Sequence, residues 1–192
     1  MKKMKKTAYR KTKMILFIVI ILSASLEAQS FKNLDEAPQD IAYYRMSRAT
    51  QPFIKVIYGR PSSKTDTVFG KQVPFEKIWR TGANEATEIK FYQDVMFGDK
   101  RIKAGSYVLV TIPGEKEWEI ILNKNLDVWG AFQYDPKADI ARIKVPVSKA
   151  EKLDVFSIAF KRIKNEIQMV LGWDTTRVKI PFQIEEIVVA KL

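Results

Sequence analysis

The feature that most constrains this chain is a two-residue alternation of apolar and polar side chains, which recurs over much of its length. A period of two places successive side chains on opposite faces of a sheet, so each alternating segment predicts a strand with one face in a core. The segments are also rich in β-branched and aromatic residues, as strands are. They cover residues 53–58, 86–91, 106–112, 117–122, 141–147 and 175–182.

Residue types that reverse a chain stand between these segments, such as Gly59-Arg60-Pro61 and Gly98-Asp99-Lys100. Residues 106–122 contain a Pro-Gly turn between two alternating segments and predict a hairpin. No segment after residue 28 predicts an amphipathic helix of three turns, and residues 32–48 are expected to form a helical turn or a loose arm. The sequence therefore predicts an all-β fold, an antiparallel β-sandwich or flattened barrel.

Some faces can be assigned from the alternation. Trp118 shares a strand face with Ile120 and Leu122, so it is expected in the core. Residues 153–160 are largely apolar on both faces, which predicts a central strand covered on both sides. Pro146 cannot donate to a ladder, which favours a sheet edge or a strand end.

The N-terminus has the order of a secretory signal peptide: a basic stretch, nine unbroken apolar residues at 14–22, then small residues. The apolar part is shorter than the roughly 20 residues that cross a bilayer. We expect cleavage near Ala28, an N-terminal arm over 29–46 and a single β domain over 47–192. The mature chain is then periplasmic or secreted, with no transmembrane helix. Without any cysteine, a lipoprotein anchor is excluded.

Charge gives little support to nucleic-acid binding. The chain has a formal net charge of +11, but its first 28 residues hold seven basic residues and one acidic residue. Residues 29–192 keep 26 basic and 21 acidic residues, a net charge of +5, and these are scattered. No basic run with interleaved aromatic residues appears, so no nucleic-acid partner is predicted.

The absence of histidine and cysteine removes much catalytic chemistry. A Ser-His-Asp triad, thiolate catalysis and zinc-thiolate sites are impossible without them. The calcium-loop pattern is also missing. The sequence predicts no metal site and no cofactor, and it leaves carboxylate, lysine or tyrosine chemistry without a recognisable spacing.

The stretch from Val73 to Phe91, VPFEKIWRTGANEATEIKF, is the most distinctive candidate site. In one interpretation Arg80 binds an anionic or hydroxylated ligand, and Glu85 orients this ligand or acts as a base. In the other the stretch is a structural corner: Trp79 packs in the core, Gly82 has a positive φ, Asn84 bonds the loop backbone, and Arg80 pairs with Glu85. The candidate ligand-binding residues are Arg60, Trp79, Arg80, Asn84, Glu85 and Trp129.

Two further sets of residues are candidate sites. Glu117 and Glu119 lie on one strand face and superficially suit a glycosidase pair, although neighbours on an exposed face are usually just solvated. Trp129, Phe132, Tyr134 and Trp173 are aromatic residues expected on loops, where they either stack on a sugar ring or close the ends of the core.

Several blocks carry a family resemblance: YGRP, FGKQVPFEKIWRTGANEATEIKF, KAGSYVLVTIPGEKEWEIILNKN and WGAFQYD. Together they strongly resemble the bacterial domain of unknown function family 2911, common in the Bacteroidetes, from about Ser47 to about Phe182. The resemblance implies an exported, β-rich domain. It implies no catalytic residues.

Three functions remain open on the sequence. The first is a binding module for a small molecule, such as a carbohydrate or another envelope ligand. The second is a carboxylate-dependent hydrolase with Glu85 as acid or base, which requires Glu85 in a concave site. The third is a structural or assembly protein of the cell envelope, which an exposed apolar patch or a free edge strand would favour.

Overall fold

The computed structural model describes residues 14, 31–164 and 166–184. By its internal contacts the chain divides into residues 1–34 and residues 35–192, and the strands belong to the second unit. The expected signal peptide over residues 1–28, with its cleavage near Ala28, lies outside the described residues except for Met14.

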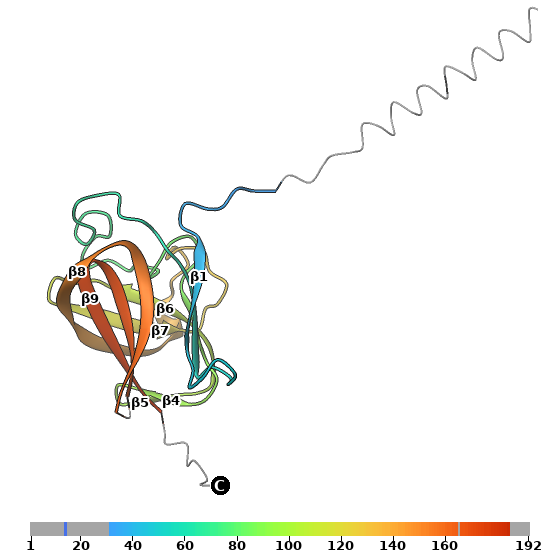
Figure 1. Ribbon diagram of the computed structural model, residues 1–192, viewed down its shortest axis with the longest axis vertical. Helices are drawn as coiled ribbons and strands as arrows, with labels where there is room; N and C mark the ends of the chain where they lie inside the picture. Colours follow the sequence, from blue (N-terminus) through green and yellow to red (C-terminus); the bar gives the residue numbers. More distant parts are fainter. Residues whose placement is uncertain (1–13, 15–30, 165, 185–192) are drawn as a thin grey trace, which may run out of the picture. The chain divides into compact units, whose positions relative to one another are not determined.

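Nine antiparallel strands form one sheet in the order β1-β2-β3-β6-β7-β8-β9-β4-β5 (Figure 1). The sheet folds over itself without closing into a continuous ladder, which confirms the prediction of an all-β sandwich or flattened barrel. A short 3-10 turn, Pro136–Ala138, precedes β8. The strands are β1 (Gln39–Tyr44), β2 (Ile54–Gly59), β3 (Glu88–Phe91), β4 (Val95–Phe97), β5 (Lys100–Ile102), β6 (Gly105–Ile112), β7 (Glu117–Asn123), β8 (Asp139–Ile163) and β9 (Glu166–Ile184).

The long strand β8 belongs to both layers of the fold. Its first part pairs with β7 as far as Pro146, opposite Glu117, and from Val147 onward it pairs with β9. Register shifts between residues 149 and 157 interrupt the second ladder, and such bulges bend a strand. In Figure 1 the orange and red β8 and β9 curve across the yellow β6 and β7. The two segments predicted at 141–147 and 153–160 are thus one strand, and Pro146 lies at the end of a ladder as expected.

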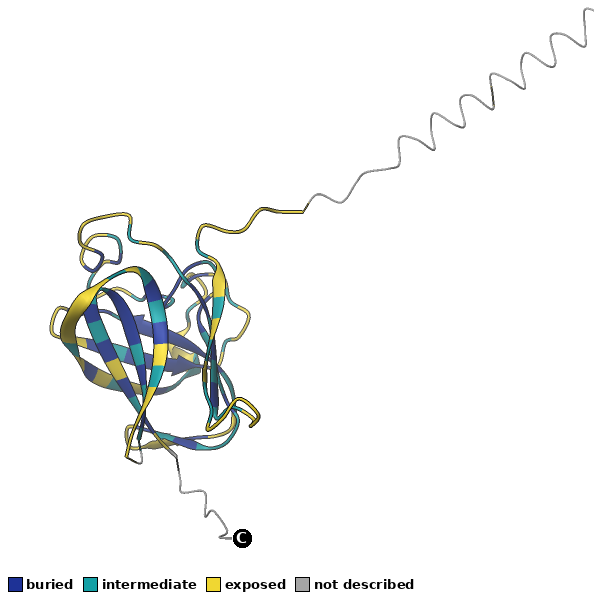
Figure 2. Ribbon diagram, in the orientation of Figure 1, coloured by how far each residue is buried: buried dark blue, intermediate teal, exposed yellow. Residues whose placement is uncertain are grey.

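The core lies between the two layers, where the buried faces of the strands meet (Figure 2). Trp118 is among its fully buried side chains, as the sequence predicts. The expectation that residues 153–160 are covered on both faces is wrong. Phe156 and Ile158 are buried, whereas Ala159 on the opposite face is exposed, because only one face of this part of β8 turns to the core.

Strand β1 was not expected. It pairs along its length with β2, from Gln39 opposite Gly59 to Tyr44 opposite Ile54, within the segment expected to form a helical turn or a loose arm. Its side chains alternate between exposed and half-buried, so the same two-residue period operates here in a more polar sequence. The boundary placed at residue 47 therefore falls after the first strand.

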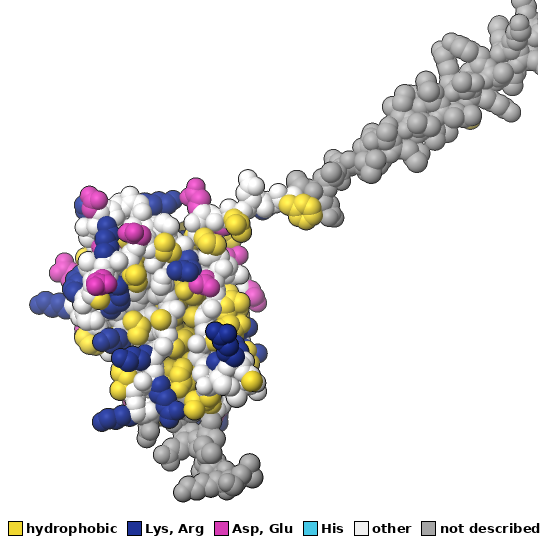
Figure 3. All heavy atoms as spheres, in the orientation of Figure 1, with side chains coloured by type: hydrophobic (Ala, Val, Ile, Leu, Met, Phe, Trp, Pro, Cys, Tyr) yellow, Lys and Arg dark blue, Asp and Glu magenta, His cyan; other side chains and the backbone are white. Residues whose placement is uncertain are grey.

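The surface supports the view that charge is scattered. On the face in Figure 3, basic side chains are separated by hydrophobic and uncharged ones, with acidic side chains among them in the upper part. In the described part of the chain, no helix has the length and apolar character needed to cross a membrane.

Candidate functional site

A cavity of about 270 Å³ lies beside the stretch that the sequence singles out. We call it the Arg80 cavity. It is lined by residues 72–74 and 77–80 of one loop, together with Pro61, Gly82 and Trp173. Two of these residues, Lys77 and Arg80, are cations and none is an acid.

Two tryptophans form the inner wall of the Arg80 cavity. Trp79 and Trp173 are 7% and 1% exposed, and their rings stack at a centroid distance of 6.1 Å and an angle of 24°. The indole of Trp79 donates to the Gly82 carbonyl at 3.1 Å, and that of Trp173 donates to the Asp154 carbonyl at 3.4 Å. Both indole N–H groups are therefore engaged by the backbone, and the wall offers a ligand only apolar ring surface.

The Arg80 side chain has no acceptor in the part of the chain that the structure describes. It makes no hydrogen bond and no ion pair with any described residue, and its Nε is enclosed without a partner. The two terminal nitrogens are not among the enclosed unpaired atoms, so they reach solvent. Burial lowers the pKa of Arg80 from its ordinary value, although an arginine side chain stays charged at neutral pH. The protein therefore does not use the hydrogen-bonding capacity of this guanidinium, which stays available to a ligand.

The other polar side chains of the lining differ in their availability. The amide of Gln72 is occupied, because its Oε1 accepts from the Lys64 amide at 2.8 Å and its Nε2 donates to the Ser62 carbonyl at 3.0 Å. Lys77 is exposed and has no ion pair within the described chain. Arg80 and Lys77 are thus the side chains of this lining that are free to bind an anion.

The residue after Arg80 holds the loop in a strained conformation. Thr81 is buried and has a φ of 60°, which is rare for a β-branched residue. Its Oγ1 donates to Thr111 Oγ1 at 3.1 Å, and its carbonyl accepts from Thr87 Oγ1 at 2.7 Å. Backbone strain maintained by surrounding bonds is common at functional sites. Here it fixes the direction of the chain on which Arg80 stands.

Close backbone packing explains two glycines at this turn. A Cβ at Gly59 would lie 2.2 Å from the Ala83 carbonyl oxygen, and one at Gly82 would lie 2.9 Å from the Gly59 carbonyl oxygen. The prediction of a positive φ at Gly82 is wrong: Thr81 and Asn84 have it instead. Gly82 is required because the turn packs against the end of β2 with no room for a side chain.

Arg60 has a structural environment away from the cavity lining. Its guanidinium donates to Asp40 at 3.1 Å, to Ser157 Oγ at 3.0 Å and to the Phe156 carbonyl at 3.3 Å. These bonds join β1 to β8 at the end of β2. Arg60 therefore has its acceptors within the protein, unlike Arg80.

The remaining candidates lie outside the lining of the Arg80 cavity. The Asn84 side chain forms a hydrogen bond with Asp35. This bond lowers the pKa of Asp35, although the hydrogen bond from the Ala37 amide lowers it more. Glu85 is exposed, forms no ion pair with Arg80, and its backbone bridges to that of Trp129. Trp129 is 58% exposed. Of the six predicted residues, Trp79 and Arg80 line the cavity together, and the other four do not.

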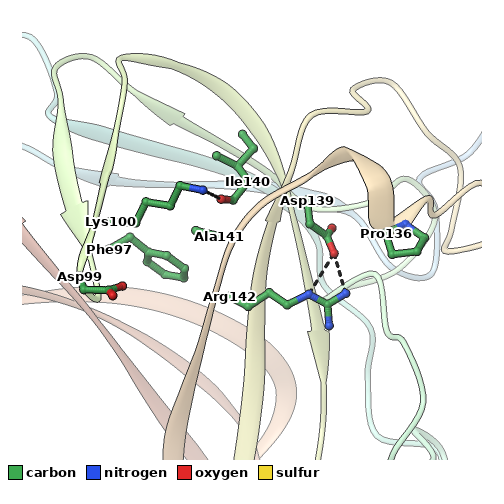
Figure 4. Close-up of a pocket in the computed structure, with 8 residues that line it drawn as sticks. All are labelled: Phe97, Asp99, Lys100, Pro136, Asp139, Ile140, Ala141 and Arg142. Carbon is green, nitrogen blue, oxygen red and sulfur yellow. Dashed lines mark hydrogen bonds and ion pairs between the residues drawn. The ribbon is translucent and has the colours of Figure 1, made fainter.

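A second cavity, of about 360 Å³, offers a comparison (Figure 4). We call it the Arg142 cavity. It also holds cations, but Arg142 donates twice to Asp139 and once to Glu119, at 3.1 Å, and Lys100 donates to the Ile140 carbonyl. The Tyr134 hydroxyl completes the network by donating to Asp139 at 2.7 Å. Both cations of this cavity therefore have acceptors within the protein.

Three sequence interpretations concern other groups. Glu117 pairs with Lys144 and Glu119 with Arg142, so the proposed glycosidase pair consists of two ion-paired side chains on a strand face. Trp173 is in the core, whereas Phe132 is exposed like Trp129. Across residues 31–164 and 166–184, no acidic cluster gathers three or more groups that could hold a metal ion.

Fold and cavity together define an all-β domain with a cationic, aromatic-walled cavity under one loop. The chain belongs to the family described as "Protein of unknown function (DUF2911)", whose model matches residues 38–182. This confirms the resemblance and extends its start to include β1. Comparisons with curated proteins and with solved structures each give no match.

Proposed function

We propose that this protein is a binding module for a small anionic ligand, which it holds in the Arg80 cavity. The observation that carries the proposal is Arg80, which lines a cavity without acidic residues and whose guanidinium has no acceptor among the described residues. A guanidinium offers parallel N–H donors that match the two oxygens of a carboxylate or phosphate. The oxygens of a bound anion would accept the hydrogen bonds for which the Arg80 guanidinium has no partner among the described residues.

The lining of the cavity favours binding over catalysis. A carboxylate-dependent hydrolase needs an acid or base within reach of the substrate. Glu85 is exposed and outside the lining, and no other carboxylate belongs to it. The Arg80 cavity therefore has groups that attract and orient an anion but no carboxylate to transfer a proton.

Export from the cytoplasm is part of the proposal, and the N-terminal sequence supports it. The basic, apolar and small-residue segments of residues 1–28 follow the order of a signal peptide. We expect mature protein recovered outside the cytoplasm of its bacterial host to begin at Gln29. Cell fractionation followed by intact-mass measurement tests this, and a full-length mass in the cytoplasmic fraction would contradict it.

The anion-binding proposal is tested by thermal shift and calorimetry with a panel of carboxylates, phosphate and sulfate. At least one anion is expected to raise the Tm of the wild type, because a ligand that binds only the folded state stabilises it. Arg80→Met should lower the affinity for that anion tenfold or more.

Arg142→Met is the matched control for this experiment, since it removes an arginine from the other cavity. It should retain the wild-type affinity. The proposal is wrong if no anion binds at millimolar concentration, or if Arg80→Met and Arg142→Met bind equally well.

A further inference from the structure

The Arg80 cavity is polar at one place and apolar elsewhere. Pro61, Val73, Pro74 and Ile78 bring only carbon side chains to its lining, and the indole N–H groups of the wall are already bonded. The Gln72 amide is bonded as well. Arg80 and Lys77 thus provide the charge, and the rest of the lining provides side chains that cannot accept or donate.

This asymmetry discriminates between classes of anion. Phosphate and sulfate carry oxygens in all directions, so some of them would face the apolar lining and lose water without a replacement bond, which is costly. An organic carboxylate carries both oxygens at one end. Its body can contact the proline, isoleucine and tryptophan side chains while its oxygens meet the guanidinium.

Size limits the ligand further. The volume of about 270 Å³ lies just below the range of about 300–1,000 Å³ that is typical of pockets for drug-sized ligands. A single ring or a short aliphatic chain with one carboxylate fits this scale.

We infer that the Arg80 cavity selects a small organic carboxylate, whose apolar part lies against the wall of Trp79 and Trp173. This inference rests on the proposed function and specifies its ligand class. Arg80 binds the carboxylate, Lys77 adds a second positive charge at an exposed position, and the apolar lining sets the preference for the body of the ligand.

The test is a calorimetric series of acetate, propionate, butyrate and valerate, with benzoate, inorganic phosphate and sulfate measured in the same buffer. Affinity is expected to rise about fourfold for each methylene buried, from about 0.8 kcal/mol per methylene. Benzoate should bind at least tenfold more tightly than acetate, and phosphate and sulfate more weakly than butyrate.

Two variants separate the roles of the lining. Ile78→Ala should lower the affinity for valerate and benzoate severalfold while leaving acetate nearly unchanged, because it shortens the apolar lining. Lys77→Gln should weaken all the carboxylates by a similar factor. If Ile78→Ala weakens acetate as much as valerate, the apolar lining does not select the ligand and the inference is wrong.

The outcomes distinguish this inference from the proposed function. Binding of phosphate or sulfate that depends on Arg80, together with a flat carboxylate series, would overturn the inference and leave the anion-binding function in place. No binding of any anion, or binding unaffected by Arg80→Met, would overturn both.

Discussion

The Arg80 and Arg142 cavities are each lined by an arginine and a lysine, but the Arg142 cavity is also lined by two acids, Asp99 and Asp139, whereas the Arg80 cavity has none. Arg142 has Asp139, Glu119 and Tyr134 as partners, whereas Arg80 has none in the described chain. A count of cations alone would rank the two cavities alike. Matching each donor with its acceptor separates them, and of the two it is the Arg80 cavity that has unused binding capacity.

The backbone explains why one arginine is paired and the other is not. Arg142 stands on β8 in a regular ladder with β7, and neighbouring strands supply cross-strand partners such as Glu119. Arg80 follows the isolated bridge of Trp79 with Thr111 and precedes the left-handed Thr81. It has no regular strand neighbour to supply a carboxylate.

The largest expected effect concerns the wall of the Arg80 cavity, which is part of the core. Trp79→Ala should lower the free energy of unfolding by about 3–5 kcal/mol, the usual cost of removing a large buried aromatic side chain. Trp129→Ala, at an exposed tryptophan, should change it by no more than about 0.5 kcal/mol. Chemical denaturation measures both. Equal effects would mean that the cavity wall is not part of the core.

Replacing each of the two arginines should change the free energy of unfolding by a smaller amount. The two changes should differ in direction, because Arg142 is paired and Arg80 is not. Arg142→Met leaves Asp139 and Glu119 without their guanidinium and should cost about 1–3 kcal/mol in unfolding free energy. Arg80→Met removes an unpaired, partly desolvated charge and should leave stability unchanged or raise it by up to about 1 kcal/mol. A loss of stability in Arg80→Met as large as that in Arg142→Met would show that the two arginines do not differ.

The smallest effect is the contribution of the Arg142 network to the pH dependence of stability. Burial, and then the hydrogen bond to Asp139, raise the pKa of Tyr134 above its ordinary value of 10.0. A raised folded-state pKa contributes stability that is complete below about pH 10 and is lost as the pH rises above it. Tyr134→Phe should therefore flatten the alkaline decline in Tm, and a decline identical to that of the wild type would contradict this.

Local patterns predicted the local parts of the fold. The hairpin expected over 106–122 is formed by β6 and β7, because β-branched alternation and a Pro-Gly turn act over neighbouring residues. Strand β1 was not predicted because its sequence, which follows Pro38, is too polar to show a clear alternation of apolar and polar side chains. The continuity of β8 was missed because the polar run from Ser148 to Lys152 resembles a loop, whereas bulges carry the strand through it.

The candidate site was also predictable only where its residues are close together in the sequence. The sequence pointed to Trp79 and Arg80, which do line one cavity. It placed Trp173 in a separate set of aromatic residues expected on loops and could not set it beside Trp79, since that residue reaches the wall through the pairing of β9 with β8. The expected Arg80 pair with Glu85 is absent because the left-handed residues Thr81 and Asn84 redirect the intervening chain.

The pairing of β9 with β4, which sets Ile184 opposite Val95, has a consequence for folding. Contacts between residues so far apart in sequence form late, because a long loop must close before they contribute stability. The sheet cannot be completed until the chain has been synthesised through β9. Until then β4 and β8 have open edges, and unpaired edges promote aggregation. A chain that ends before β9 should therefore accumulate in insoluble form.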